Sequence, residues 1–445
     1  MRSLPRLAIG TIQEGANLQA VLVALLDTLR RGGVQTQCFS ARASLPGQWT
    51  SKSVTGLPGR FLDSWLMSPE LCCSLLHRTS GGADLAAVVG SFGSRPPDEN
   101  EPGGSLDTLC DWLSLPRIAV IDAALIDQHG LPPRPGVDAV LVDHASDRRS
   151  SGEMITDIEA LWGLPVIGVL DSADKARHEI AKLAPGVEVP DELCRRLSAD
   201  FQACWRPDRF ARLIAEAAPL ETCFPEIVHE LMSPKPTVAV AYDEAFFGYF
   251  PSTLDQLELL GAQVIDFSPL RDEGLPPETN IVYLGCGRPE SFAQTLSDNH
   301  CMKSALRSHV ASGGRIYAEV GGAAYLSQML EVPSGEIHRM CGILPAIARL
   351  QTGDASAMPT EITVTQSNWL ASTGTRLRGY RSGRWNFEAL GCRLNSNPKS
   401  CCQPDLLGCH CVVGSLIHFH LAALPEILQS FFRPPLPSVP LLAPW

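Results

Sequence analysis

The stretch that decides the fold is Leu7-Ala-Ile-Gly10-Thr11-Ile-Gln-Glu-Gly15-Ala-Asn17, followed by a helical pattern and the pair Gly32-Gly33. Its first residues form a short apolar run that enters a glycine-containing turn, which is typical of a buried strand. From Leu18 to Leu29 the apolar residues recur at helical spacing. Arg30, Arg31 and the glycine pair then supply last-turn cations and a helix stop. Residues 34–39 predict the next strand, so the chain opens with a β–α–β unit.

The first half of the chain continues this alternation. Strands are predicted over residues 86–89, 117–121, 137–142 and 164–170, and the last three runs end at Asp122, Asp143 and Asp171. Apolar runs of this length between helices are typical of a parallel sheet. Ligands of such sheets bind at the carboxyl ends of the strands, so we expect polar site residues there.

A second alternating series follows a segment with prolines at 219, 225, 234 and 236, around a predicted helix over 226–232. It predicts strands over 237–241, 263–267, 280–284 and 315–318, and helices over 253–260 and 304–312. The predicted fold class is therefore α/β, with two doubly wound domains of mainly parallel sheet. We expect domains over 1–218 and 236–432, a linker over 219–235 and a proline-rich tail over 433–445.

Composition limits the functions that the chain can have. Of 445 residues, 36 are basic and 48 acidic, a net charge of −12, so no general attraction to nucleic acid or anionic membrane is expected. No apolar run approaches the roughly 18–20 residues of a membrane helix. The start lacks the pattern of a signal peptide, so we expect a cytoplasmic protein whose fifteen cysteines are reduced thiols.

Several phrases in the sequence together resemble the cobyrinic acid a,c-diamide synthase family of cobalamin biosynthesis. In the second half they are Asp243-Glu-Ala-Phe246, Tyr249-Phe-Pro251, Asp266-Phe-Ser-Pro-Leu-Arg-Asp272, Tyr283-Leu-Gly-Cys-Gly-Arg-Pro-Glu290, Gly313-Gly-Arg-Ile-Tyr-Ala-Glu-Val-Gly-Gly322 and Ser415-Leu-Ile-His-Phe-His420. The first half agrees through Leu62-Asp-Ser-Trp-Leu-Met67, Ala83-Asp-Leu85 and Leu164-Pro-Val-Ile-Gly168. The resemblance covers nearly the whole chain.

This resemblance implies two linked activities. The first half resembles a P-loop ATP domain of the dethiobiotin synthetase type, which activates carboxylates of a corrin. The second half resembles a class I glutaminase, which supplies ammonia for the amides. Corrinoids or other tetrapyrroles, a protein partner and a homodimer are the partners that we expect; nucleic acid and membrane are not expected.

The predicted nucleotide loop, marked by Gly10, Thr11, Gly15 and Asn17, is degenerate. A phosphate loop needs glycines whose amides cradle phosphate, a lysine, and a hydroxyl for Mg²⁺. The family's glycine, lysine and two threonines correspond here to Ala16, Asn17, Leu18 and Gln19. No register restores the lysine, because the first one in the chain is Lys52.

Three further changes in the first half point the same way. Glu14 places a carboxylate where phosphates would approach. The family's acidic metal ligand corresponds to Val89, which cannot hold Mg²⁺. A second lysine of the family is also absent, and Arg42 is a weak substitute. We therefore expect no cofactor, with Mg·ATP bound only if a ligase activity survives.

The glutaminase nucleophile is missing as well. Class I glutaminases place a cysteine on a tight strand-to-helix elbow, next to a histidine base and backbone amides that stabilise an oxyanion. The resemblance places Val320 at the cysteine, His418 at the base, and Gly285 and Gly287 in the oxyanion loop. Valine has no nucleophilic atom, so hydrolysis of glutamine by this route is excluded, and we interpret His418 as structural.

Two neighbouring features leave alternatives open. Cys286 is the only thiol in the neighbourhood of the oxyanion loop, so a relocated nucleophile is one alternative. A small buried residue is the favoured interpretation, because the family's geometry puts this loop on the opposite side of the bound carbonyl. Tyr380 and Gly383 stand where the family carries histidines on the side that faces the corrin. Recognition of the family's substrate is therefore in question.

A cluster of thiols and imidazole offers an alternative metal site. It comprises Cys392, Cys401, Cys402, Cys409, His410 and Cys411. We expected Cys409 and Cys411 to share one face of a strand, which would allow joint ligation of zinc beside His410. The spacing lacks a paired C-x₂-C framework, and a loop with incidental free thiols is the favoured interpretation.

Three functions compete on these observations. The first is a non-catalytic relative of the diamide synthases that acts by binding a tetrapyrrole or a protein. The second is an active ATP-dependent amide ligase that amidates the a- and c-carboxylates of a corrin, with ammonia from solution or from a partner glutaminase. The third is a different enzyme on the same scaffold, using the Cys/His cluster and a metal.

Overall fold

A computed structural model describes residues 4–44, 52–93, 103–145, 148–183, 187–215, 233, 235–352, 357–390, 393–396, 404–409 and 411–434. The chain divides into two compact units. Unit 1 comprises Met1–Ala43 and Gln48–Glu226, and unit 2 comprises Ser44–Gly47 and Ile227–Trp445. The division after Glu226 falls within the predicted linker, 219–235. Nearly all of that linker, the helix predicted over 226–232, and the tail beyond residue 434 lie outside the described residues.

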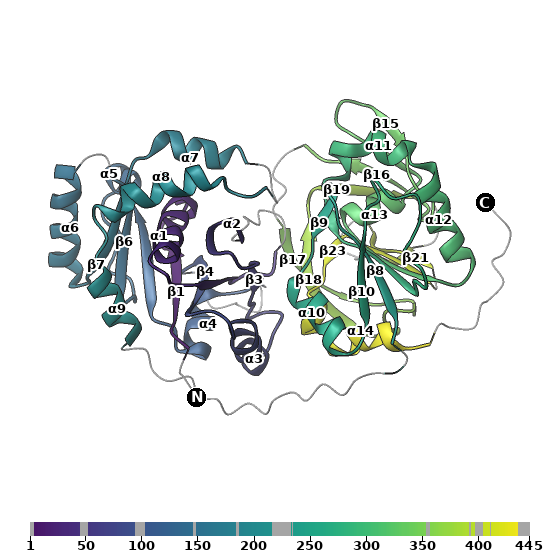
Figure 1. The fold of residues 1–445 in the computed structure, drawn as a ribbon, viewed down its shortest axis with the longest axis horizontal. Helices are drawn as coiled ribbons and strands as arrows, with labels where there is room; N and C mark the ends of the chain where they lie inside the picture. The colour runs from purple at the N-terminus through teal and green to yellow at the C-terminus, as the bar shows by residue number, and fades with distance from the viewer. Residues whose placement is uncertain are drawn as a thin grey trace. The chain divides into compact units, whose positions relative to one another are not determined.

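Unit 1 is built on a parallel sheet (Figure 1). Its strand order is β3-β2-β4-β1-β5-β6-β7. The strands are β1 (Arg6–Thr11), β2 (Thr36–Ser40), β3 (Arg60–Phe61), β4 (Leu85–Ser91), β5 (Arg117–Asp122), β6 (Ala139–Ala145) and β7 (Val166–Asp171). The strands predicted from the sequence are confirmed to within about two residues at their ends. Because all seven run the same way, Thr11, Asp122 and Asp171 end at one edge of the sheet.

Nine helices of unit 1 lie within the described residues. They are α1 (Gln19–Arg31), α2 (Lys52–Thr55), α3 (Pro69–Thr79), α4 (Leu106–Leu113), α5 (Ala123–His129), α6 (Arg148–Trp162), α7 (Asp174–Ala181), α8 (Asp191–Gln202) and α9 (Pro207–Ala215). Helix α1 ends as the sequence predicts. Gly33 adopts φ +84°, and the Val34 amide bonds to the Leu29 carbonyl oxygen at 2.9 Å, which satisfies the last turn.

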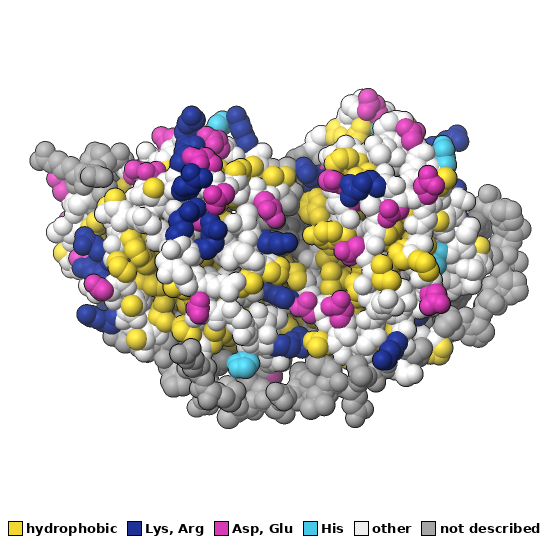
Figure 2. All heavy atoms as spheres, in the orientation of Figure 1, with side chains coloured by type: hydrophobic (Ala, Val, Ile, Leu, Met, Phe, Trp, Pro, Cys, Tyr) yellow, Lys and Arg dark blue, Asp and Glu magenta, His cyan; other side chains and the backbone are white. Residues whose placement is uncertain are grey.

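Helix α1 is buried through ten consecutive positions, from Ala20 to Leu29, because α8 packs against it. One of the buried positions is Asp27, whose carboxylate needs partners in an apolar setting. Figure 2 shows basic side chains with acidic ones between them over the region of α1, α7 and α8. The charges on this part of the surface are therefore mixed.

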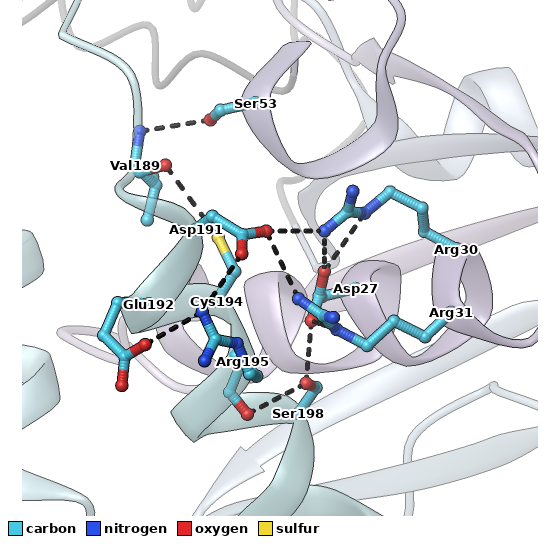
Figure 3. A network of polar contacts seen from close by, with 10 residues as sticks. All are labelled: Asp27, Arg30, Arg31, Ser53, Val189, Asp191, Glu192, Cys194, Arg195 and Ser198. Atoms are coloured by element: carbon cyan, nitrogen blue, oxygen red, sulfur yellow. Dashed lines mark hydrogen bonds and ion pairs between the residues drawn. The ribbon is translucent and has the colours of Figure 1, made fainter.

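Polar partners hold Asp27 in place (Figure 3). Its Oδ1 accepts from Arg30 Nη2 at 2.6 Å, and its Oδ2 accepts from Arg31 Nε at 2.5 Å and from Ser198 Oγ on α8 at 2.7 Å. Asp191, at the start of α8, accepts from Arg30 Nη2 at 3.0 Å. Burial opposes ionisation of Asp27, but these hydrogen bonds outweigh it and lower the pKa. The last-turn arginines thus join α1 to α8.

Unit 2 contains a second seven-stranded sheet, of order β10-β8-β11-β13-β22-β21-β20. Its strands are β8 (Thr237–Ala241), β10 (Gln263–Phe267), β11 (Ile281–Leu284), β13 (Arg315–Glu319), β20 (Arg393–Ser396), β21 (Pro404–Cys409) and β22 (Val412–Ser415). The first five in that order are parallel, whereas β21 and β20 are antiparallel additions at one edge. The predicted mainly parallel sheet is confirmed, and the antiparallel edge was not predicted.

Smaller sheets complete unit 2. They contain β9 (Phe246–Gly248), β12 (Cys286–Gly287), β14 (Met329–Glu331), β15 (Ile337–Arg339), β16 (Ala346–Leu350), β17 (Ala357–Thr363), β18 (Arg376–Ser382), β19 (Trp385–Ala389) and β23 (Ile417–His418). The helical segments are α10 (Pro251–Leu259), α11 (Ala293–Asp298), α12 (His300–Ala311), α13 (Gly321–Leu326), α14 (Pro425–Gln429), η1 (Pro289–Phe292), η2 (Leu421–Ala423) and η3 (Ser430–Phe432). Strand β23 places His418 beside Tyr380 of β18.

Among the described residues, no helix combines the length and the apolar character that crossing a bilayer requires. Ten of the described cysteines are free thiols. Burial raises the pKa of the thiols of Cys38, Cys72 and Cys341 to about 12, so these side chains pack as neutral apolar groups.

Candidate functional site

The loop between β1 and α1 occupies the place of the predicted nucleotide loop. Gly15 adopts φ +80°, and Asn17 Oδ1 accepts from the Gln19 amide at 2.8 Å. Gln13 fixes the loop to the end of β5, because its side-chain amide bonds to both backbone groups of Asp122, at 2.7 and 3.2 Å. The Gln19 amide at the start of α1 is therefore already bonded by a side chain of the loop.

The four residues predicted for this loop separate into two pairs. Gly15 and Asn17 line a cavity of about 380 Å³. Gly10 instead packs beneath Phe92 and Leu106, where a Cβ would approach both side chains to 2.8 Å. The Thr11 hydroxyl donates to Ser91 Oγ at 3.2 Å and is buried.

The charged side chains of this cavity are arranged around His144. Its Nδ1 lies 3.5 Å from Asp122 Oδ1, and its Nε2 lies 3.3 Å from Asp174 Oδ1. His144 itself adopts φ +60°, an unusual backbone conformation for a residue with a side chain. Asp122 follows a predicted strand and could be anticipated. His144 and Asp174 could not, because no sequence spacing links them.

Arg177 is the arginine that lines this cavity, and its charge is already neutralised. It donates through Nη1 to Asp143 Oδ2 at 2.9 Å and through Nη2 to the other carboxylate oxygen. Asp143 is fully buried; burial raises its pKa, although Arg177 opposes this. Besides His144 and His178, the lining thus offers a phosphate two carboxylates and an arginine that is already paired, a combination with little net attraction for a polyanion.

In unit 2, the strand-to-helix elbow is present without its nucleophile. Strand β13 ends at Glu319, α13 begins at Gly321, and Val320 between them adopts φ +47° and ψ −94°. The Val320 amide donates to the Ser415 carbonyl oxygen at 2.7 Å, and the Val320 carbonyl oxygen accepts from Ala324 at 2.9 Å. Positive φ at a β-branched residue costs about 1–3 kcal/mol, so the surrounding fold imposes this conformation.

The predicted oxyanion loop lies against the elbow. The Gly322 amide donates to the Gly285 carbonyl oxygen at 3.1 Å, and a Cβ on Gly321 would lie 3.1 Å from the Gly287 nitrogen. A Cβ on Gly287 would overlap the Ala245 carbonyl oxygen, so this glycine is required by close packing. The structure therefore brings Val320, Gly285 and Gly287 together at the elbow.

His418 lies beside the elbow and is fully buried. Its Nδ1 is 3.5 Å from Glu319 Oε2, and neither ring nitrogen has a hydrogen-bond partner among the described residues. Glu319 Oε1 accepts from the Tyr317 hydroxyl at 2.6 Å and from the Tyr283 hydroxyl at 3.3 Å. Burial and the Glu319 carboxylate raise the pKa of both tyrosines. The histidine and its acidic neighbour are thus held in a closed polar cluster.

Cys286 has the wrong electrostatic setting for a relocated nucleophile. It lies on β12, opposite Gly248 of β9, with its sulfur packed against that glycine. Burial, with Glu319 nearby, raises the pKa of this thiol far above its usual value. The nucleophilic form of cysteine is the thiolate, so this setting favours the interpretation of Cys286 as a small buried residue.

The structure corrects the geometry assumed for the thiol cluster. Cys409 ends β21, whereas Cys411 precedes β22, and Cys409 pairs with Val412 across a hairpin. The two cysteines therefore flank a turn and do not share a strand face. A spacing of two residues alone cannot distinguish a continuous strand from a tight turn. His410, Cys392, Cys401 and Cys402 lie outside the described residues, within which no group of three metal-binding side chains occurs.

Tyr380 and Gly383, at the two positions where the family carries histidines, lie in a strand and in a bend. Tyr380 is fully buried on β18, and Gly383 lies in the bend between β18 and β19. Val89, at the family's metal-ligand position, pairs with Ile9 in the sheet. Each of these positions therefore contributes to packing or chain direction.

Comparison with known proteins adds to this geometry. A family model described as a CobB/CobQ-like glutamine amidotransferase domain matches residues 237–423. The chain is 28% identical to the cobyrinate a,c-diamide synthase of Dehalococcoides mccartyi (strain CBDB1), over 97% of this chain and 98% of that protein. It is 26% identical to the protein of the same name from Salmonella typhimurium (strain LT2), over 93% and 95%. A solved glutamine amidotransferase structure matches 44% of this chain and 98% of its own, with 17% identity and a TM-score of 0.33.

Proposed function

Because the chain belongs to the cobyrinate a,c-diamide synthase family, we propose that it acts in cobalamin biosynthesis as a member that neither hydrolyses glutamine nor uses ATP. Its role in this proposal is binding, and the ligand is a tetrapyrrole or a protein partner. Val320 is the observation that carries the proposal, since it stands at the elbow where a nucleophile is required. Backbone amides and a buried histidine alone cannot form the covalent intermediate of a glutaminase.

The first unit supports the same proposal through its charges. The cavity beside the loop presents Asp122 and Asp174, and Asp143 neutralises Arg177. No lysine lies before Lys52 in the chain, so the β/γ-phosphates of ATP would lack their usual cation. These features oppose binding of Mg·ATP independently of the change in unit 2.

The scaffold has nevertheless kept demanding features. The elbow holds a β-branched residue at positive φ, and Gly287 and Gly322 still permit close backbone approach. Both units retain continuous apolar cores. Selection that maintains the folded protein explains these retained features better than the accumulation of mutations without selection does. A maintained fold without catalysis favours a binding role.

A product assay tests the loss of both activities. The purified protein is incubated with cobyrinic acid, Mg·ATP and either glutamine or a high concentration of ammonium, and products are measured by mass spectrometry. We expect no amidated product under either condition. The Salmonella typhimurium relative, prepared in parallel, serves as the positive control.

Two other outcomes would contradict the proposal. Product with ammonium alone would mean that the ligase is active and takes ammonia from solution or a partner. Product with glutamine would mean that another residue replaces the cysteine. The binding role is measured separately by equilibrium dialysis against cobyrinic acid and by co-purification of partners; binding of neither kind would remove the second part of the proposal.

A further inference from the structure

A second cavity, of about 890 Å³, lies at the opposite edge of the unit 1 sheet from the loop of residues 12–18. Its walls come from residues that precede three strands, namely Pro116 before β5, Val137 before β6 and Pro165 before β7, together with α9. Neither former catalytic centre lies here. In parallel α/β sheets the expected ligand edge is the other one, so the fold does not assign this cavity a role.

The lining of this cavity has an aliphatic part and a basic part. The apolar part consists of Leu115, Pro116, Val137, Leu164, Pro165 and Leu213. The basic part consists of three arginines: Arg134 from the segment before β6, and Arg209 and Arg212 from α9. The lining is thus mixed in character, with aliphatic side chains beside charged ones, and its volume is within the usual range for a small-molecule site. We call it the arginine pocket.

One arginine of the pocket is held in place, and the two acids of the lining are engaged. Arg209 Nη1 pairs with Glu159 and donates to the Val166 carbonyl oxygen at 2.8 Å. Burial opposes ionisation of Glu159, yet Arg209 and the Val166 amide lower its pKa overall. Asp138 Oδ2 accepts from the Arg117 amide at 2.7 Å.

Arg134 and Arg212 remain without such partners. Both are exposed, and in the described part of the chain neither makes a hydrogen bond or an ion pair. This contrasts with Arg30 and Arg31, whose charges are taken up by Asp27 and Asp191 (Figure 3). The surroundings of Arg134 are also stiff, because prolines 133 and 135 flank it.

We propose that the arginine pocket binds a small amphipathic anion that has an apolar body and at least two carboxylate groups. Arg134 and Arg212 come from different segments, so each can take one carboxylate in a bidentate arrangement. The aliphatic lining contacts the body of the ligand, and the fixed Arg209 keeps the rim in shape. On a chain of net charge −12, two unpaired arginines in one cavity provide a local preference for an anion.

Naphthalene-2,6-dicarboxylate is a suitable probe, because it combines an apolar body with two carboxylates. Its binding to the full chain is measured by isothermal titration calorimetry. We expect 2-naphthoate, with one carboxylate, and tricarballylate, with no apolar body, to bind more weakly. Loss of two charge-assisted contacts in the Arg134→Gln/Arg212→Gln variant should weaken binding of the dicarboxylate about tenfold or more.

The control variant is Arg206→Gln, which removes one positive charge just before α9 at a residue that does not line the pocket. Its affinity should equal that of the wild type. All three substituted side chains are exposed, so circular dichroism should show unchanged folding in either variant. Equal affinity of the double variant and the wild type would overturn the inference, as would absence of binding at millimolar dicarboxylate. Neither result affects the proposed function, which does not depend on this pocket.

Discussion

His418 Nδ1 lies 3.5 Å from Glu319 Oε2, and both side chains are fully buried next to the elbow residue Val320. Tyr317 and Tyr283 hold the other carboxylate oxygen. A histidine paired with an acid is the arrangement that activates a nucleophile in many hydrolases. The fold thus places a buried histidine and its acidic neighbour beside a strand-to-helix elbow whose central residue, at positive φ, is Val320.

Val320→Cys should therefore produce a reactive thiol. Cysteine is not branched at Cβ, so it fits the positive φ with less strain. We expect His418 to take up the thiol proton, because it lies 3.5 Å from Glu319, the residue before the elbow. We expect alkylation of the variant by the glutamine analogue 6-diazo-5-oxo-L-norleucine, read as a mass increase on residue 320. Adding His418→Asn should slow this labelling by about a hundredfold, the usual effect of losing a base.

The matched control for this change is Val320→Ala, which has no thiol at the elbow. It reports the background from the remaining cysteines, several of which have raised pKa values. Labelling of Val320→Cys no faster than this background would contradict the inference that the elbow and His418 retain a productive geometry.

Stability should fall in acid because of His420. This histidine is buried against Phe250, and burial lowers its pKa from 6.5 to about 4. The unfolded chain takes up a proton below pH 6.5, whereas the folded chain does so only near pH 4. The stability that comes from keeping His420 neutral is therefore fully present above pH 6.5. It is lost as the pH falls toward 4, and the total loss in the free energy of unfolding is about 3 kcal/mol.

The measurement is the free energy of unfolding in urea between pH 7.5 and 4.5, for the wild type and His420→Leu. Leucine cannot titrate, so the variant should lose less stability than the wild type over this range. Parallel pH profiles would show that His420 does not cause the acid sensitivity.

Asp27→Asn should destabilise unit 1. The substitution removes the charge that Arg30, Arg31 and Ser198 bind, at a fully buried position between α1 and α8. Since both arginines are about a third exposed, we expect a loss of about 1–3 kcal/mol in urea denaturation, below that for a wholly buried ion pair. Asp191→Asn is the control from the exposed end of the same network and should have little effect. Equal effects of both substitutions would contradict the importance of the buried carboxylate.

Gln13→Ala should loosen the loop between β1 and α1. The Gln13 amide makes both hydrogen bonds to the Asp122 backbone, so its loss should lower the free energy of unfolding by about 1–2 kcal/mol. Amide hydrogen exchange of Asp122 should become faster. Gln19→Ala offers a comparison at the start of α1, since the Gln19 side chain makes no hydrogen bond in the described part of the chain, and should change stability by less than about 0.5 kcal/mol.

Much of the fold follows from local sequence. The buried strands of both units are continuous apolar runs, and α1 is marked by its spacing and its glycine stop, so their positions were predicted to within a few residues. The antiparallel strands of unit 2 were not predicted, because charged residues such as Arg376 and Arg393 interrupt their apolar pattern. The segment from Cys409 to Val412 is a hairpin, although the sequence pattern favoured a single strand. Period-two spacing does not reveal where a strand turns back.

The sequence by itself determined which chemical groups are present: no lysine before residue 52, valine at position 320, and histidine at 418. These absences are properties of residue identity, and folding cannot supply a missing atom. Tertiary structure alone decided which groups meet. The placement of His144 between Asp122 and Asp174, the contact of His418 with Glu319, and the gathering of Arg134 with Arg212 all join residues 22 or more positions apart. Such meetings depend on strand order and helix packing, which bring distant segments together through buried contacts that no local pattern encodes.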